Sequence, residues 1–103
     1  MSEVLRIYQS PLSSDGWRFV YMPLRTFKAA GYDHPPRRFY EKVYEGSLPS
    51  WDPETIFTIF NLRHPTDYKA RSLSVSDVIE LADDTHSEFY FCDTIGFARI
   101  QFE

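Results

Sequence analysis

A clear helix start constrains the fold of this chain more than any other local pattern. Asp52 can accept hydrogen bonds from the free amides of a first helical turn, and Pro53 suits the first helical position. Apolar residues then recur at helical spacing. Because Pro65 disfavours helical backbone at the residue before it, the pattern predicts a helix that runs from Pro53 to near Arg63.

Short segments with alternating side chains lie on both sides of this helix and predict a sheet. The predicted strands cover residues 4–8, 17–21, 39–45, 75–81, 89–92 and 97–102, the last three joined by polar turns at 82–86 and 93–96. A turn at residues 13–16 favours a hairpin between the first two strands. A second, short helix is predicted over residues 23–30, since Pro23 suits a first turn and Gly31 suits the left-handed residue that ends a helix.

The order of these elements, β-β-α-β-α-β-β-β, predicts an α+β fold. A length of 103 residues fits a single domain over residues 1–103. We expect a largely antiparallel sheet of about six strands, with the two short helices packed on one of its faces. The pattern leaves the order of the strands across the sheet open.

Composition excludes several classes of protein. Fifteen acidic residues against eleven basic ones give a net charge of -4, which argues against nucleic-acid binding through overall positive charge. No apolar run approaches the ~20 residues of a transmembrane helix, and the start lacks the pattern of a secretory signal, so we expect a cytoplasmic protein with no membrane partner. Cys92, the single cysteine, excludes an intramolecular disulfide and a zinc site built on several thiolates.

Charge is distributed unevenly along the chain. Residues 1–71 hold ten basic and eight acidic residues, whereas residues 72–103 hold one basic and seven acidic residues. The candidate binding residues are Arg37, Arg38, Tyr40 and Lys42 in one group and Arg63, Lys69 and Arg71 in a second. Basic groups interleaved with aromatic rings suit a protein partner or a nucleic-acid strand. A solvated face whose aromatic residues belong to the core would give the same pattern.

Three groups of reactive residue types occur, and each has an ordinary structural explanation. Four possible metal ligands lie within six residues, but their spacing matches no EF-hand or zinc pattern and suits a hairpin loop: Asp83, Asp84, His86 and Glu88. Cys92 has no base placed beside it by the sequence, and an inert buried thiol is its usual state. His64 and Asp67 could form an acid–base pair, although a histidine at a helix end more often interacts with the helix carbonyls. We therefore predict no catalytic residue, no metal site and no cofactor.

Two motifs resemble the YodL-like domain family. One is Arg71-Ser72-Leu73-Ser74-Val75-Ser76-Asp77-Val78, and the other is Cys92-Asp93-Thr94-Ile95-Gly96-Phe97, in which Thr94 and Ile95 replace the family's Ser and Phe. Further likeness occurs at Tyr44-Glu45-Gly46, at Phe60-Asn61 and at His64-Pro65-Thr66-Asp67-Tyr68, so the resemblance spans most of the chain. It implies a bacterial protein, encoded in many cases on a conjugative element, from a family that no enzymatic activity defines.

Both motifs also have a physical explanation. Asp77 can accept amide hydrogen bonds at the entrance to a strand, which predicts a structural bend there. Gly96 fits a turn that needs a positive φ. Neither motif by itself indicates a reaction.

Together these observations favour a small non-enzymatic bacterial accessory or interaction domain that modulates a protein partner. The alternative is a nucleic-acid-associated accessory protein of a conjugative element, whose binding would weaken steeply as salt rises. A homodimer is a further option, since the alternating segment 97–102 is a candidate edge strand.

Overall fold

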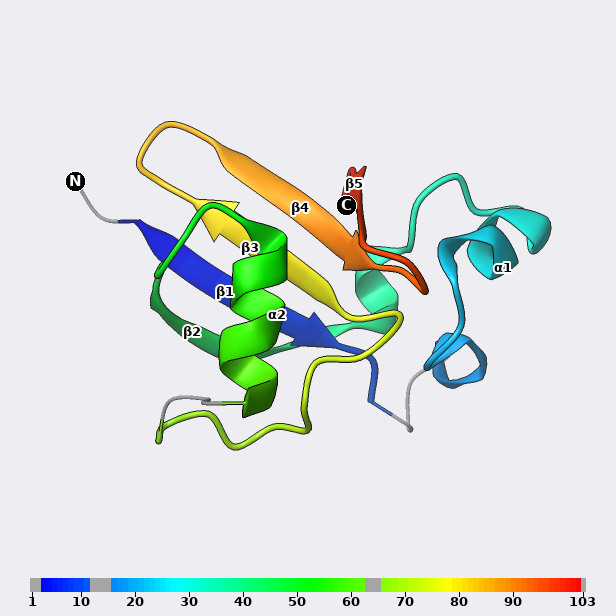
Figure 1. The fold of residues 1–103 in the computed structure, drawn as a ribbon. Coiled ribbons are helices and arrows are strands. Elements are labelled where there is room, and N and C mark those ends of the chain that lie inside the picture. Colours follow the sequence, from blue (N-terminus) through cyan, green and yellow to red (C-terminus); the bar gives the residue numbers. More distant parts are fainter. Residues whose placement is uncertain (1–2, 12–15, 63–65, 103) are drawn as a thin grey trace.

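The computed structural model describes residues 3–11, 16–62 and 66–102, and its strands form one antiparallel sheet (Figure 1). The elements are β1 (Val4–Gln9), η1 (Trp17–Phe19), α1 (Leu24–Ala29), η2 (Arg37–Phe39), β2 (Glu41–Ser47), α2 (Pro53–Leu62), β3 (Val78–Ala82), β4 (Ser87–Cys92) and β5 (Phe97–Ile100). The strand order across the sheet is β2-β1-β3-β4-β5. The α+β prediction is confirmed, with five strands in the described part of the chain instead of about six.

The strand predicted over residues 17–21 is wrong. Residues 17–19 form the short 3₁₀ helix η1, and the Phe19 amide donates to the carbonyl of Gly16 at 2.8 Å. Trp17 and Tyr21 are 57% and 58% exposed, so the alternating aromatic residues do not cover a sheet. The predicted hairpin is also absent because β1 is already paired on both sides, with β2 and with β3.

Helix α2 begins where the sequence predicts it. Asp52 accepts hydrogen bonds from the Glu54 amide at 3.3 Å and from the Thr55 hydroxyl at 2.9 Å. The helix packs on one face of the sheet through a first cluster of buried residues: Leu5, Ile7, Ile56, Phe60, Tyr68, Leu73, Ile79 and Leu81. No helix within the described ranges is long and apolar enough to cross a membrane.

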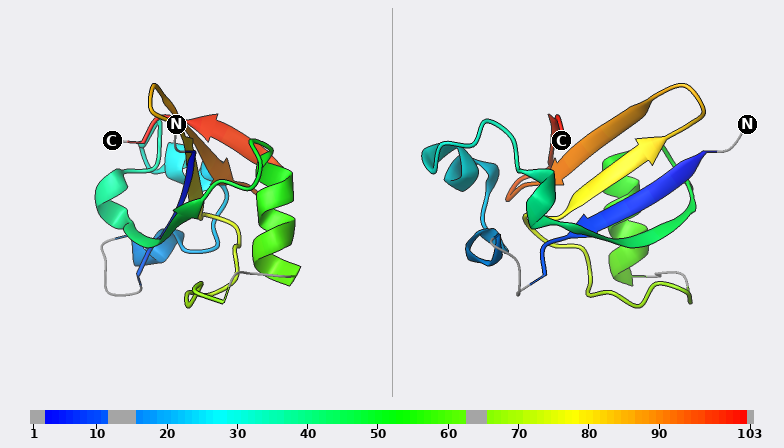
Figure 2. Two further views of the ribbon diagram at one scale, coloured as in Figure 1. Left: turned by 90° about the vertical axis from the view of Figure 1, so that its left-hand side faces the viewer. Right: turned by 180° about the vertical axis from the view of Figure 1, so that it is seen from behind.

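A second cluster covers the opposite face of the sheet, and it includes Phe27 of α1. Its buried members are Tyr8, Phe27, Phe39, Val78, Phe91, Ile100 and Phe102. The expectation that both helices lie on one face is therefore wrong, as the two further views show (Figure 2). The reason is that β1 and β3 carry large apolar side chains on both faces, so each face needs a cover.

Helix α1 ends as the sequence predicts. Gly31 follows its last turn with a φ of 98°, and the Tyr32 amide donates to the carbonyl of Phe27 at 3.0 Å. The first free amide of the helix, that of Leu24, donates to the Asp93 carboxylate at 3.3 Å. This bond ties α1 to the turn between β4 and β5.

Several strand boundaries differ from the predicted ones. β2 begins after Phe39, which belongs to η2, and it runs through Gly46, which pairs with Leu5. β3 begins at Val78, three residues late, because Ser76 adopts a φ of 85° in the preceding turn. The turn before β4 covers residues 83–86, since Ala82 belongs to β3; β4 begins at Ser87 instead of residue 89, and β5 ends at Ile100 instead of residue 102. Residues 13–15 of the turn predicted at 13–16 lie outside the described residues.

Candidate functional site

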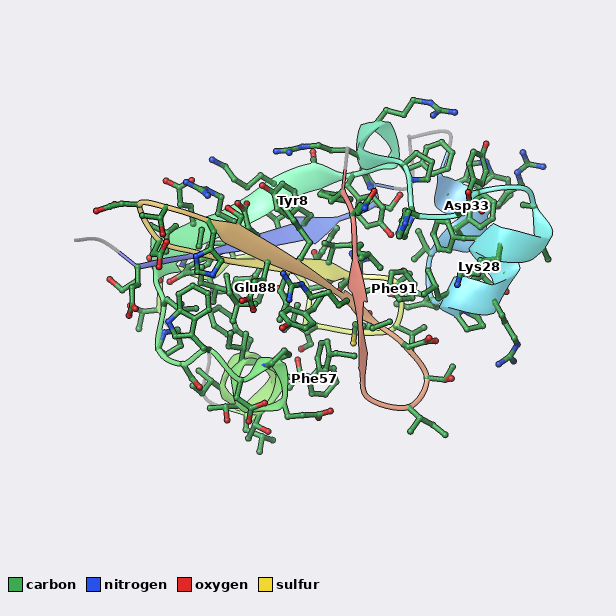
Figure 3. The ribbon with its side chains drawn as sticks, turned by 90° about the horizontal axis from the view of Figure 1, so that it is seen from above. Tyr8, Lys28, Asp33, Phe57, Glu88 and Phe91 are labelled. Atoms are coloured by element: carbon green, nitrogen blue, oxygen red, sulfur yellow. The ribbon has the colours of Figure 1, made fainter. Side chains whose placement is uncertain are left out.

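Two exposed arginines of the first candidate group lie side by side on η2, on the face of the sheet away from α2. The preceding Pro36 is extended, and the buried ring of Phe39 anchors the short helix in the second cluster. Figure 3 shows Tyr8 on this side of the sheet and Phe57 on the α2 side. The local fold therefore holds Arg37 and Arg38 outward on a fixed support.

Aromatic rings support both guanidinium groups. Arg37 donates to the Tyr8 hydroxyl at 3.2 Å, and its guanidinium carbon lies 5.2 Å from the centre of the Tyr8 ring. The same group lies 5.5 Å from the centre of the Phe102 ring. Arg38 lies 4.8 Å from the centre of the Phe39 ring. These cation–π contacts restrict the two side chains without neutralising their charge.

The other two residues of the first group are engaged within the domain. The Tyr40 hydroxyl donates to the carbonyl of Ser76 at 2.6 Å, and burial raises its pKa far above the ordinary value. The Lys42 ammonium lies 2.8 Å from the Glu45 carboxylate, which also accepts from Arg6 at 2.8 Å. The hydrogen bond from Lys42 is the largest cause that lowers the pKa of Glu45 to about 2. Only the two arginines of this group therefore present a charge with no acidic partner among the described residues.

Of the second candidate group, the structure describes Lys69 and Arg71. Arg63 lies outside the described residues, and Lys69 is exposed. Arg71 forms an ion pair with the buried carboxylate of Asp77 at 3.1 Å, and its guanidinium lies 5.5 Å from the centre of the Tyr21 ring. Arg71 is therefore tied into the fold.

Asp77 organises the predicted bend before β3. Its carboxylate accepts from the Ser74 amide at 2.9 Å, as the sequence predicts, and also from the Gln9 side chain at 3.1 Å. The same Gln9 amide group donates to the carbonyl of Arg71 at 3.0 Å and to the hydroxyl of Tyr68 at 3.3 Å. Burial raises the pKa of Asp77 to about 6, although Arg71, the Ser74 amide and Gln9 all act to lower it.

Among the remaining reactive residues, the His86 ring lies 3.3 Å from the carboxylates of both Asp83 and Glu88. Burial raises the pKa of the Cys92 thiol to about 12, which fits an inert core residue. Asp83 accepts from the amides of Thr85 and His86 and so shapes the turn between β3 and β4. In the described part of the chain, no three His, Cys, Asp or Glu side chains are grouped to hold a metal ion. Asp67 is exposed, and His64 lies outside the described residues.

A cleft of about 550 Å³ lies beside η2. Its lining includes Arg18, which is not among the candidate binding residues predicted from the sequence. It is lined by Arg18, Phe19, Thr26, Ala30, Tyr32, Arg38 and Phe39, which come from η1, α1, η2 and the segment after α1. Arg18 lies in η1, within the segment that was predicted to be a strand over residues 17–21. The 3₁₀ conformation of η1 brings Arg18 into the same cleft as Arg38.

Comparison with known families agrees with the motifs. The model of the YodL-like domain matches residues 4–102. The chain belongs to the YodL-like domain family. No curated protein and no solved structure matches it significantly. In this YodL-like domain, the first motif forms the bend at residues 74–77. Asp77 accepts from the Ser74 amide within the bend, and the Tyr40 hydroxyl donates to the carbonyl of Ser76.

Proposed function

We propose that this YodL-like domain is a small, cytoplasmic, non-enzymatic accessory domain that binds an acidic surface of a partner protein through Arg37 and Arg38. The observation that carries the proposal is the state of these two side chains. Both are exposed, both are supported by aromatic rings, and neither has an acidic partner among the described residues. The bacterial and mobile-element setting that the resemblance implies is part of the proposal.

Preorganisation favours arginine as the contact residue. A guanidinium that already rests on a ring loses less side-chain entropy when it meets a carboxylate, and its planar fork matches two carboxylate oxygens. Lys42 and Arg71 differ because each already faces a carboxylate of the domain. Binding a second acidic group there would require breaking an existing ion pair.

The test uses the tagged domain to capture partners from a Gram-positive bacterial lysate, with and without nuclease treatment. The variant Arg37→Glu with Arg38→Glu reverses the proposed surface. The matched control is Arg25→Glu with Lys28→Glu, which makes the same charge change at two exposed positions of α1. Circular dichroism and thermal unfolding of all three proteins check that the fold is intact.

We expect the wild type and the control to retain the same protein after nuclease treatment, and the η2 variant to lose it by at least ~tenfold. Equal retention by both variants would refute the role of η2. Equal loss from both would show a response to total charge and would also contradict the proposal. If material is retained only without nuclease, and is released steeply as salt rises, the nucleic-acid alternative replaces it.

A further inference from the structure

The cleft beside η2 has the size and lining of a small-ligand site. Its volume of about 550 Å³ falls within the range of ordinary ligand pockets, roughly 300–1,000 Å³. The cleft is open at the surface, at the end of the molecule where Lys28 and Asp33 are seen with α1 (Figure 3). This inference goes beyond the proposed partner surface, which shares only Arg38 with the cleft.

Three aromatic rings form a fixed wall of the cleft. The centres of the Phe19 and Phe39 rings lie 5.8 Å apart with nearly parallel planes, and Tyr32 meets both rings edge-on at 6.0 and 5.6 Å. Phe27 supports Phe19 from the core at 4.5 Å. Because these rings hold one another, the wall does not have to order when a flat ligand binds.

Two cations border this wall, and neither is neutralised in the described part of the chain. Arg18 and Arg38 form no ion pair there, whereas Arg6, Lys42 and Arg71 all do. Arg38 rests over the Phe39 ring and is directed by it. The hydroxyl of Thr26, also in the lining, adds a neutral hydrogen-bonding group. None of the described residues in the lining carries a carboxylate that would repel an anion.

We propose that this cleft binds a phosphate monoester of a compound that also contains an aromatic ring, with the phosphate between Arg18 and Arg38 and the ring against Phe19 and Tyr32. A phosphate monoester has a charge of about -1.5 to -2 at neutral pH, which matches two guanidinium groups better than a single carboxylate does. Arginine forks also fit phosphate oxygens in pairs. The aromatic wall accounts for the ring, since the flat faces and edges of Phe and Tyr pack well against one.

The test is a titration followed by ¹H–¹⁵N NMR, including the Nε–Hε signals of the arginines. The probes are phenyl phosphate, inorganic phosphate and phenol, which separate the combined group from its charged part and its ring. We expect phenyl phosphate to bind at least ~tenfold more tightly than either of the other two, with the largest shifts at Arg18, Arg38 and Tyr32. Equal binding of phenyl phosphate and inorganic phosphate would overturn the proposal.

Conservative variants locate the site. Arg18→Gln and Arg38→Gln keep two of the three methylene groups and remove the charge, and each is expected to weaken phenyl phosphate binding about tenfold. Arg25→Gln on α1, outside the cleft lining, should leave it unchanged. If Arg25→Gln weakens binding as much as Arg18→Gln, the response is to total charge and the site is refuted.

Two further probes identify the source of the ligand. An acetylated phosphotyrosine amide stands for a modified protein side chain, and adenosine monophosphate stands for a free nucleotide. Tighter binding of either one than of inorganic phosphate supports the shared chemistry and selects the source, and failure of both contradicts it. Because Arg18 is not part of the proposed partner surface, loss of protein capture and loss of probe binding are separate results.

Discussion

At Asp77 a single buried carboxylate joins the end of β1 to the segment before β3 through three donors. Gln9 lies at the end of β1, Ser74 and Arg71 lie in the segment before β3, and all three donate to it. A carboxylate placed in the interior is unfavourable unless its oxygens are satisfied, so these donors decide whether the bend is stable. The sequence predicts that Asp77 accepts amide hydrogen bonds, and Ser74 supplies one, but the sequence gives no sign of the bond from Gln9, which is 68 residues away.

The raised pKa of Asp77 predicts that the stability of the domain depends on pH. Between its ordinary value of 3.8 and its folded value of about 6, the folded protein keeps a proton that the unfolded chain has released. The contribution of Asp77 to stability is therefore full below pH 3.8 and is lost as the pH rises through about 6. We expect this contribution to fall by up to about 3 kcal/mol across that window.

Urea unfolding at several pH values from about 4 to 7 measures this effect in the wild type and in Asp77→Asn. The asparagine side chain does not titrate in this range, so the stability of the wild type relative to Asp77→Asn should fall as the pH rises from about 4 to 7. Glu45 and Asp83 have lowered pKa values, so their contributions to stability change mainly below the pH range of this experiment. A difference between the two proteins that stays constant with pH would contradict the prediction.

Among the elements, η1 depends on a close approach that only glycine permits. A Cβ atom at Gly16 would lie 2.5 Å from Cβ of Phe39 and 2.9 Å from the hydroxyl oxygen of Ser10. The backbone before η1 is therefore packed directly against η2. This packing places Arg18 near Arg38, although an alternating aromatic segment at residues 17–21 indicates a strand when it is considered alone.

Gly16→Ala should therefore destabilise the domain by about 1–3 kcal/mol, because the added methyl group must displace Phe39. Gly31→Ala is the matched control, since a Cβ there meets no atom within 4 Å and only its φ of 98° opposes the change. That conformational term is about 1 kcal/mol. Urea unfolding measures both, and a smaller loss for Gly16→Ala than for Gly31→Ala would show that the two short helices are not tightly packed.

Across the whole molecule, one sheet separates two hydrophobic clusters. Ile7 and Ile79 face the first cluster, while their neighbours Tyr8 and Val78 face the second. β1 and β3 contribute side chains to both clusters. Unfolding of either strand therefore disrupts both clusters. This arrangement makes the domain a single cooperative unit despite its two cores.

Substitution on either face should therefore weaken the entire fold. We expect Ile56→Ala in the first cluster and Phe27→Ala in the second each to lower the free energy of unfolding by about 2–5 kcal/mol, with one transition and an unchanged urea dependence. Leu62→Ala, at a side chain that is 78% exposed, should change it by less than about 0.5 kcal/mol. A two-step curve for Phe27→Ala, with α2 persisting after the first step, would contradict the single-unit description.

The sequence by itself determined the features that depend on neighbours in the chain. The cap at Asp52, the left-handed Gly31 and the predicted bend at Asp77 follow from hydrogen bonds over a few residues, and the fold class follows from the order of periodic segments. The tertiary structure decided what depends on distant contacts. Pairing of β1 with both β2 and β3 left residues 17–21 without a partner strand, and the ion pair at Arg71 removed it from the candidate surface. The cleft lined by Arg18 and Arg38 also depends on distant contacts. Packing between separate segments of the chain brings the two arginines together, and no local backbone preference does so.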